Sequence, residues 1–357
     1  MRIVNVILMG FGMIGQRVAR MIAENRPSVT GVHLCLRAIA DSRSTVFAQG
    51  IQPHVISLLA GKRKHGEPIG EPGYLIAPNL QEVLGSTPAI LVDATNSDRT
   101  GVIFERAIEL GHRGVTANKK LVCGRMDIFH NITMAGATRF EATVGAGIPV
   151  IAKLQSMIAA GDEIRCIRAC ASGTLGYIFW QLGRSLTFAQ AVETARKEGY
   201  TEPNPADDLS GMDVLRKLII LGRVCGFHWA DDAQIRLPAL LPIRYRDFSA
   251  ERLMKALPRL NDRYKKKVTM ARSSGSNVLR YVATTEPKRG RIQLLAVPAA
   301  SPLGRLEGPE NGFMIHSKYY PDRPLFLSGP GAGAAVTAEA VMGDIIAHAR
   351  ELTGGTR

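Results

Sequence analysis

Cysteine is scarce in this 357-residue chain and follows no metal-binding pattern. The five cysteines stand at positions 35, 123, 166, 170 and 225, an odd number with no Cys-x-x-Cys pair. This spacing argues against a disulfide framework and against a zinc site, and it favours the reducing cytoplasm. No apolar run approaches the ~18 residues that a membrane-spanning helix needs, so we expect no membrane partner.

Acidic and aromatic residues are also few. The chain has 31 Asp and Glu against 45 Lys and Arg, a net charge of +14, and 6% aromatic residues. Because the basic residues are scattered and their densest run, 62–64, is short, we interpret them as a solvated surface and expect no nucleic-acid partner. With 46% apolar and 21% charged residues, the composition is typical of a globular protein, and the length predicts two or three domains.

A glycine fingerprint follows the first apolar stretch. Residues 3–9 are almost wholly apolar, as in a central parallel strand, and lead into the motif GFGMIG at 10–15. Between a strand and a helix, the first glycine permits the tight turn, the second the approach of a diphosphate, and the third close helix–strand packing. The expected contacts with a dinucleotide are Gly10, Gly12, Met13, Ile14 and Gly15.

Alternating elements predict the fold class. Apolar strands at 32–40, 89–93 and 114–117, with a helix at 100–110, indicate an α/β domain with a doubly wound parallel sheet. Residues 42–75 are rich in Gly, Pro and basic residues, and we expect a mobile flap or excursion there. After about residue 141 the pattern becomes that of an α+β domain. Its predicted helices lie at 152–160, 187–198 and 211–225, its strands at 164–171, 278–284, 291–297 and 312–317, and a last helix lies within 333–352.

Two residues near the end of the second strand indicate different cofactors. Asp41 stands where a carboxylate binds the ribose 2′-hydroxyl of NAD, whereas Arg43 stands where a cation holds the 2′-phosphate of NADP. The cations at 62–64 are further candidates for the same phosphate. We favour NADP and keep NAD as the alternative.

The segment GYTEPNPADDLSGMDVLRK at 199–217 contains the highest concentration of candidate catalytic and binding residues. Asp213 and Lys217 are four residues apart and share one helix face, while apolar residues cover the rest of the helix. A buried pair of this kind seldom serves stability alone, and the lysine is suited to donate and accept a proton. The alternative is an exposed helical ion pair. The carboxylates of Glu202 and Asp208 are suited to bind an ammonium or hydroxyl group.

Two further segments are suited to ligands. Lys119, in TANKK at 116–120, follows a strand end, where ligands bind in open α/β sheets. The segment EATVGAGIP at 141–149 combines one carboxylate with the carbonyls of a glycine-rich turn, a set that can coordinate a monovalent cation. A hinge between domains is the alternative for that segment.

Seven motifs together resemble homoserine dehydrogenase over nearly the whole chain. They are GFGMIG at 10–15, DATNS at 93–97, TANKK at 116–120, EATVGAGIP at 141–149, SGTLGYIF at 172–179, the segment at 199–217 and GPGAGAAVTAEAV at 329–341. The resemblance implies reversible NAD(P)-dependent interconversion of L-homoserine and L-aspartate 4-semialdehyde, in threonine and methionine biosynthesis. It also implies a homodimer with an NAD(P)-binding Rossmann domain at 1–140, an α+β catalytic and dimerisation domain at 141–328, and a C-terminal helix at 329–357 that returns to the nucleotide-binding domain.

The resemblance also implies roles for individual residues. Lys217 matches the proposed acid/base, Asp213 a residue that orients the substrate, and Lys119 a residue between cofactor and substrate. The matched substrate-binding positions are Thr174, Glu202, Asp208, Asp213 and Lys217. Thr95 and Gly333 match positions beside the nicotinamide. A sodium ion is implied at Glu141 with the carbonyls of Val144, Ala146 and Ile148.

Two features depart from longer or more typical members of the family. Gly176 stands where many members have Asn or Ser, which removes a side chain near the expected substrate contacts. The chain ends soon after its last predicted helix, so we expect neither an ACT regulatory domain nor a fused aspartate kinase.

Two other functions are alternatives. A semialdehyde dehydrogenase that acylates a cysteine needs a cysteine with a partner base, and the apolar settings of the five cysteines offer none. A non-catalytic NADP-binding sensor would not need the intact set Glu202, Asp208, Asp213 and Lys217.

Overall fold

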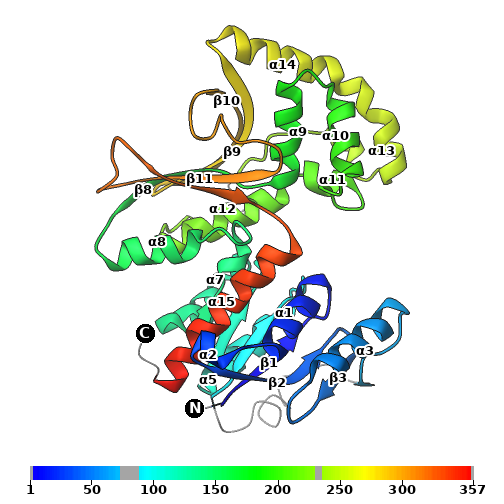
Figure 1. The fold of residues 1–357 in the computed structure, drawn as a ribbon. Helices are drawn as coiled ribbons and strands as arrows, with labels where there is room; N and C mark the ends of the chain where they lie inside the picture. The colour runs from blue at the N-terminus through cyan, green and yellow to red at the C-terminus, as the bar shows by residue number, and fades with distance from the viewer. Residues whose placement is uncertain (1–2, 73–87, 230–234, 355–357) are drawn as a thin grey trace. The chain divides into compact units, whose positions relative to one another are not determined.

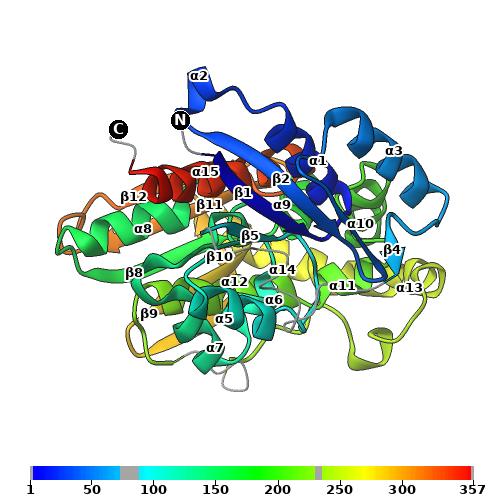
Figure 2. The same cartoon turned by 90° about the horizontal axis from the view of Figure 1, so that it is seen from below.

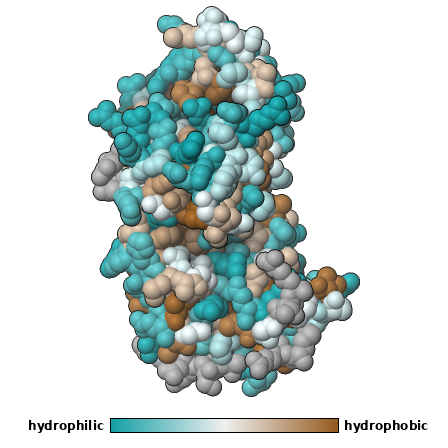
Figure 3. Space-filling model, turned by 90° about the vertical axis from the view of Figure 1, so that its left-hand side faces the viewer, coloured by the Kyte–Doolittle hydropathy of each residue, from teal (hydrophilic) through white to brown (hydrophobic). Residues whose placement is uncertain are grey.

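The chain forms two compact units. The computed structural model describes residues 3–72, 88–229 and 235–354. The first unit is Met1–Gly147 with Gly333–Arg357, and the second is Ile148–Ala332 (Figure 1). In the described residues, none of the helices combines the length and apolar character needed to cross a membrane. Hydrophilic and hydrophobic residues are interspersed on the face drawn in Figure 3.

The first unit is built on a seven-stranded sheet of order β4-β3-β2-β1-β5-β6-β7. The strands are β1 (Ile3–Met9), β2 (His33–Ala40), β3 (Ser44–Phe47), β4 (Glu71–Pro72), β5 (Ile90–Asp93), β6 (Arg113–Thr116) and β7 (Thr138–Arg139). From β2 to β7 the pairings are parallel, and β3 and β4 extend the β2 edge in antiparallel register. The predicted parallel strands at 3–9, 32–40, 89–93 and 114–117 are confirmed to within a residue.

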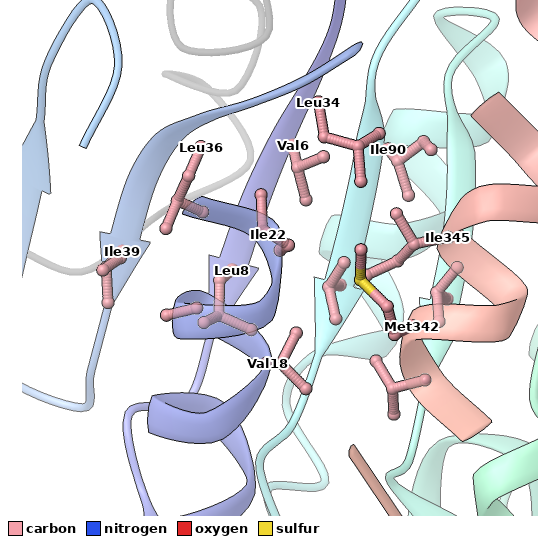
Figure 4. Close-up of a cluster of buried hydrophobic side chains, with 14 of the residues drawn as sticks. Val6, Leu8, Val18, Ile22, Leu34, Leu36, Ile39, Ile90, Met342 and Ile345 are labelled. Carbon is pink, nitrogen blue, oxygen red and sulfur yellow. The ribbon is translucent and has the colours of Figure 1, made fainter. Parts of the chain in front are cut away.

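Helices pack on both faces of this sheet, as the doubly wound prediction requires. They are α1 (Met13–Ala23), α2 (Pro27–Thr30), α3 (Pro53–Lys64), α5 (Gly101–Glu109), α6 (Lys119–Cys123), α7 (Met126–Thr133) and α15 (Ala334–Thr353), with the short turns η2 (Met134–Gly136) and η3 (Glu141–Thr143). Alternate residues of β1 enter two cores. Val6 and Leu8 pack with α1 and α15 (Figure 4), whereas Ile7 belongs to a second core with residues of α5. The helices α1 and α15 lie side by side (Figures 1 and 2), although their sequences are more than 300 residues apart.

Of the two alternatives for 42–75, a mobile flap or an excursion, the part that the structure describes, 42–72, is an excursion that packs on the sheet. This segment contains β3, α3 and β4, and it joins the sheet edge through the pairing of β3 with β2. Ile56, Leu59 and Ile69 are buried in the same core as β1. A Cβ at Gly70 would lie 2.4 Å from the Thr45 carbonyl oxygen, so glycine allows the chain to pass close to β3. Residues 73–75 of the predicted flap lie outside the described residues.

The second unit has a five-stranded antiparallel sheet of order β10-β9-β8-β11-β12. The strands are β8 (Ile164–Cys170), β9 (Asn277–Glu286), β10 (Arg289–Pro298), β11 (Glu310–Ser317) and β12 (Leu325–Pro330). The helices are α8 (Val150–Ala159), α9 (Gly173–Gly183), α10 (Phe188–Lys197), α11 (Pro205–Leu209), α12 (Met212–Val224), α13 (Ala250–Ala256) and α14 (Asn261–Ser273), with the turns η5 (Ile243–Tyr245) and η6 (Leu257–Leu260). The predicted α+β character is confirmed.

The two faces of this sheet differ. Helices α9, α12 and α14 pack against β9, and the ring of Phe179 on α9 is stacked on that of Tyr281 on β9. On the opposite side, Val282 belongs to a small core that includes Leu303. Four half-buried apolar side chains border this small core: Leu295, Val297, Met314 and Phe326.

Candidate active site

The glycine motif forms the turn between β1 and α1. Gly10 has φ +95°, and a Cβ there would lie 2.7 Å from the backbone of Ala94; a Cβ on Gly15 would lie 1.9 Å from the Gly10 carbonyl oxygen. In contrast, a Cβ on Gly12 would meet no described atom within 4 Å. Gly12 is the N-cap of α1, so open space lies before the first-turn N–H groups, among them those of Met13 and Ile14. This turn fits the diphosphate of a dinucleotide.

At the end of β2, the Asp41 carboxylate is already engaged by the protein. Its Oδ1 accepts hydrogen bonds from the backbone N–H groups of Arg43 (2.8 Å) and Ser44 (2.9 Å). Its Oδ2 accepts from Nη1 of Arg63 at 3.2 Å, and the Asp41 side chain is only 2% exposed. The Arg43 side chain is exposed and donates to the Gly66 carbonyl at 3.2 Å. The arrangement therefore offers cations at the surface and a carboxylate beneath them.

Polar side chains at the ends of β5 and β6 form one network. Asp93 is fully buried, and its carboxylate accepts from the Thr95 N–H (2.8 Å) and the Thr100 hydroxyl (2.7 Å). Asn118 donates to Asp93 Oδ2 at 3.0 Å and caps α6 by accepting from the Lys120 N–H at 3.1 Å. The network fixes Thr95 and the start of α6, where Lys119 is half-buried. Asp93 and Asn118 were not identified from the sequence as the residues that hold this network together. Both are polar residues at the ends of adjacent strands, and that position could have indicated their role.

In the second unit, Asp208 connects the start of α9 with the loop before α11. The Thr174 hydroxyl lies 2.8 Å from Asp208 Oδ1 and 2.5 Å from the Tyr200 carbonyl oxygen. Asp208 Oδ2 accepts from the Glu202 N–H at 2.8 Å, and the Glu202 side chain is exposed. Burial raises the pKa of the Asp208 carboxyl above its usual range, and the charges of Glu202 and Asp213 raise that pKa further, against the two hydrogen bonds.

Helix α12 holds the predicted Asp–Lys pair. Lys217 is 6% exposed, and its Nζ lies 2.7 Å from Asp213 Oδ2 and donates to the Ala171 carbonyl at 2.6 Å. Buried apolar residues fill the rest of the helix: Val214, Leu215, Leu218, Ile219, Ile220 and Leu221. The prediction that the pair is partly buried is confirmed: Lys217 is buried, whereas the Asp213 side chain is 45% exposed. A cation fixed by an anion and a carbonyl is suited to move a proton.

The predicted cation segment begins in the short turn η3. Glu141 is 8% exposed, and its N–H donates to Asp344 Oδ2 on α15 at 2.9 Å. Burial raises the pKa of Asp344 to about 7, and the charge of Glu141 contributes to the increase. Ala146 has φ +55°, an uncommon conformation for a residue with a side chain. Sequence reasoning missed Asp344, because only the fold brings positions 141 and 344 together.

The segment offers carboxylate and carbonyl oxygen atoms, which are suitable ligands for a monovalent cation. The described residues contain no group of three His, Cys, Asp or Glu side chains able to hold a metal ion. A cation here would thus depend on the backbone carbonyls of Val144 and Ala146 in addition to the Glu141 carboxylate. Ile148 opens the second unit, and its carbonyl accepts from the Val150 N–H at 2.7 Å.

The predicted site residues divide between the two units. The first unit contains Gly10, Gly12, Met13, Ile14, Gly15, Asp41, Arg43, Thr95, Lys119, Glu141, Val144, Ala146 and Gly333, the N-cap of α15. The second unit contains Ile148, Thr174, Glu202, Asp208, Asp213 and Lys217. Within it, Thr174 with Asp208 and Asp213 with Lys217 are in direct contact.

Four of the five cysteines, Cys35, Cys166, Cys170 and Cys225, do not resemble activated nucleophiles. Burial raises the pKa of Cys170 and of Cys225 to about 12, and it also raises the pKa of Cys35 and Cys166. A reactive cysteine needs the opposite shift, because the thiolate is the nucleophile. These four cysteines therefore give no support to the cysteine-acylating alternative.

Solved structures share this fold. An unknown-function protein from Candida auris has a TM-score of 0.87 and 27% identity, with 98% of this chain and 99% of that chain covered. A hyperthermophilic archaeal homoserine dehydrogenase in complex with NADPH has a TM-score of 0.74 at 24% identity, with 100% and 99% covered. At that identity, the second likeness concerns the fold alone.

Sequence comparison adds curated relatives. A bifunctional aspartokinase/homoserine dehydrogenase from Haemophilus influenzae is 36% identical over 72% of this chain, which spans only 32% of that relative. The homoserine dehydrogenase of Schizosaccharomyces pombe is 34% identical, with 96% of this chain and 94% of the relative covered; that of Saccharomyces cerevisiae is 31% identical, with 98% and 99% covered. The homoserine dehydrogenase family profile matches residues 149–346. Two relatives above 30% identity over nearly their whole length, together with this profile, establish that the chain belongs to the homoserine dehydrogenase family.

Proposed function

We propose that this protein is an oxidoreductase that interconverts L-homoserine and L-aspartate 4-semialdehyde with NADP(H). The main support is the buried ammonium of Lys217, held by Asp213 and the Ala171 carbonyl within a family whose named members are homoserine dehydrogenases. Intact proton-transfer groups of this kind have no purpose in a non-catalytic sensor, and no observation favours that alternative.

The substrate side of the site lies in the second unit. Asp208 and Glu202 supply carboxylates suited to the ammonium group of an amino acid, and Thr174 supplies a hydroxyl beside them. The Asp208 carboxylate is half-buried, which strengthens its attraction for a cation relative to an exposed carboxylate. We assign these three residues to homoserine binding.

Lys217 manages the proton of the reaction. During oxidation, Lys217 acts in its neutral amine form: it accepts the proton of the homoserine hydroxyl and becomes the ammonium, while C4 gives up a hydride to the bound nicotinamide and becomes the aldehyde carbon. During reduction, Lys217 returns a proton to the oxygen that develops negative charge. Asp213 and Ala171 keep the ammonium oriented, and the positive charge of Lys119 provides further stabilisation of that oxygen.

The first unit is suited to the cofactor. A bound nicotinamide dinucleotide supplies or accepts the hydride at C4 of the substrate. Gly12 leaves room for its diphosphate at the start of α1, and Thr95 and Gly333 are assigned to its nicotinamide end. Arg43 and Arg63 are suited to a 2′-phosphate, whereas the Asp41 carboxylate is occupied by protein donors. This favours NADP over NAD.

A sodium ion is proposed at Glu141 with the carbonyls of Val144, Ala146 and Ile148. The observation that supports it is the pair of buried carboxylates, Glu141 and Asp344, whose negative charge a cation would balance. Sodium should raise the melting temperature relative to choline at equal ionic strength, and Glu141→Gln should remove the difference. An equal response of the wild type to both cations would contradict this site.

A homodimer is proposed through the sheet face of the second unit that bears Leu295, Val297, Met314 and Phe326. These half-buried apolar side chains border a small core on the side away from α9 and α12. Met314→Arg should shift the protein to monomers in sedimentation analysis. Met270→Arg on α14, where the native side chain is 70% exposed, is the matched control and should leave the dimer intact.

The cellular setting is part of the same proposal. Cys35, Cys166, Cys170 and Cys225 are free thiols, which suits a reducing cytoplasm. The reaction would supply homoserine for threonine and methionine biosynthesis.

The direct test is an absorbance assay for reduced nicotinamide with purified protein and L-homoserine. We expect homoserine-dependent reduction of NADP+ and a lower kcat/KM with NAD+. If both cofactors bind but homoserine reduces neither, the proposed activity is wrong.

A further inference from the structure

Asn311 lies between the reaction site of the second unit and the glycine-rich segment that leads out of it. On β11 it is paired with Gly329 of β12. Its neighbour Gly312 is paired with Cys170, so Asn311 follows that antiparallel register to the position beside Ala171. Alternation along β11 directs its side chain to the same face as Phe313, the face on which α9 packs.

The amide of Asn311 is buried and unpaired. The residue is 0% exposed, and neither Oδ1 nor Nδ2 has a hydrogen-bond partner within the described ranges 3–72, 88–229 and 235–354. Burial of an amide without partners is costly, so such a group needs an explanation. Leucine has a similar size and would avoid the cost, which indicates that packing alone does not require asparagine here.

The backbone of Gly331 packs directly against this amide. A Cβ on Gly331 would lie 1.9 Å from Cγ of Asn311 and 2.1 and 2.2 Å from its two polar atoms. The backbone of residue 331 therefore rests directly on the amide and leaves no room for a side chain. Ala332 and Gly333 follow at once, and Gly333 is assigned to the nicotinamide end of the cofactor.

Residues near Asn311 and Gly331 also pack against the start of α9, which bears the proposed substrate-binding residue Thr174. A Cβ on Gly173, next to Thr174, would lie 3.2 Å from the Pro309 carbonyl oxygen and 3.9 Å from the Ala332 Cβ. The Ala171 carbonyl, adjacent in register to Asn311, accepts the hydrogen bond from Lys217 Nζ at 2.6 Å. Asn311 thus lies against both the segment that leads to the cofactor and the strand end that holds the proton-transfer lysine.

We propose that Asn311 is a positioning residue whose amide holds residues 329–332, through Gly331, in the conformation that presents Gly333 to the nicotinamide. The free donor and acceptor of the amide pair with the peptide groups of this segment when cofactor is bound. This inference rests on the proposed function for the location of the nicotinamide. In this proposal, Asn311 acts through Gly331 and does not itself contact the substrate carbon or the transferred proton.

The test compares two ligands on Asn311→Leu. NADPH contains the nicotinamide, whereas adenosine 2′,5′-bisphosphate has only the adenosine end. We expect Asn311→Leu to raise the Kd of NADPH about tenfold and to lower kcat by a similar factor, because the segment is misplaced. The Kd of adenosine 2′,5′-bisphosphate should change by less than about twofold. The melting temperature of the ligand-free variant should rise by about 2–4 °C, because two unpaired polar atoms are removed from the interior.

Two further variants separate this role from general stability. Thr285→Val also removes from the second unit a fully buried hydroxyl that has no hydrogen-bond partner among the described residues, and it should leave both Kd values and kcat unchanged. Gly331→Ala forces a Cβ against the amide and should weaken NADPH but not adenosine 2′,5′-bisphosphate.

Two results would overturn the proposal. The first is an NADPH Kd and kcat of Asn311→Leu that both stay within twofold of the wild type. The second is equal weakening of both ligands, which would indicate a general distortion. If the wild type does not oxidise homoserine, the proposed function fails, and the contrast between the two ligands still tests Asn311.

Discussion

Asp213 and Lys217 join their charged groups at 2.7 Å on successive turns of α12, yet their side chains are 45% and 7% exposed. The anion is thus accessible to solvent while the cation is buried. The Ala171 carbonyl receives the same ammonium at 2.6 Å, so two acceptors on different elements fix its position. This asymmetry suits a lysine that exchanges a proton with a bound substrate while its orientation stays constant.

Removal of the charge of Asp213 should reduce turnover without abolishing the fold. In Asp213→Asn the shape is kept, but the buried ammonium loses its anion. We expect kcat/KM for homoserine to fall roughly 10- to 100-fold and the free energy of unfolding to fall by roughly 1–2 kcal/mol, because the half-exposed partner is screened by solvent. Steady-state kinetics and chemical denaturation measure the two effects. Wild-type kinetics in this variant would show that the pair is only structural.

Homoserine binding should depend on the ionisation of Asp208. Its pKa is raised by burial, so its carboxylate is protonated at a higher pH than an ordinary aspartate. As the pH falls through this raised pKa, the negative charge is lost and KM for homoserine should rise, by up to about tenfold per pH unit. Asp208→Asn should raise KM roughly 10- to 100-fold and remove this pH dependence. The exposed neighbour Asp207, changed to Asn, is the matched control and should leave the KM profile as in the wild type.

The preference for NADP should depend on Arg63. Arg63→Ala removes a cation from the end of β2 and frees Oδ2 of Asp41, which then resembles the carboxylate that binds the ribose of NAD. We expect KM for NADP+ to rise about tenfold while KM for NAD+ stays constant or falls. Arg106→Ala, which removes an exposed helical arginine paired with Glu109, serves as control. Equal increases for both cofactors would contradict a role at the 2′-phosphate.

Asp344 should make the stability of the protein fall as the pH rises. Its folded-state pKa is raised to about 7 from 3.8, so the folded protein binds a proton that the unfolded chain releases. Its contribution to the free energy of unfolding is therefore lost between about pH 4 and about pH 7, at most ~1.4 kcal/mol per pH unit. Asp344→Asn keeps an acceptor for the Glu141 N–H and cannot ionise.

Denaturation in sodium-free buffer tests this effect. We expect Asp344→Asn to be more stable than the wild type at pH 8, by roughly 2–4 kcal/mol, and similar to it near pH 4. If the variant and the wild type lose stability in parallel as the pH rises, Asp344 is not the responsible group.

Local signals predicted the elements that hold the cofactor. The apolar run of β1, the glycines at 10, 12 and 15 and the apolar spacing of α1 all act within 20 residues, so the sequence is sufficient to place them. The pair on α12 was predictable for the same reason, because helical periodicity puts positions 213 and 217 on one face. These features do not depend on distant parts of the chain.

Features that depend on distant contacts were missed. Helix α3 was taken for part of a flap or excursion, because the apolar residues of this segment do not form one clear helix face. Ile56 and Leu59 are buried in a core that β1 and α1 complete only in the tertiary fold. Helix α14 is so polar that no apolar face predicts it, although Tyr264 and Ala271 are buried. The contact of Glu141 with Asp344 and that of Asn311 with Gly331 join segments that only the tertiary fold brings together.

The most direct test of the account is the turnover of Lys217→Ala beside that of Lys197→Ala, with NADPH affinity measured for both. Lys197 is also in an i,i+4 ion pair, with Glu193 at 2.8 Å, but its side chain is 71% exposed, and it lies on α10 and not on α12. We predict that Lys217→Ala loses roughly 10²- to 10⁴-fold in kcat for homoserine oxidation with NADPH affinity unchanged, whereas Lys197→Ala behaves as the wild type. If Lys217→Ala retains the kcat of the wild type, Lys217 is not the proton-transfer residue.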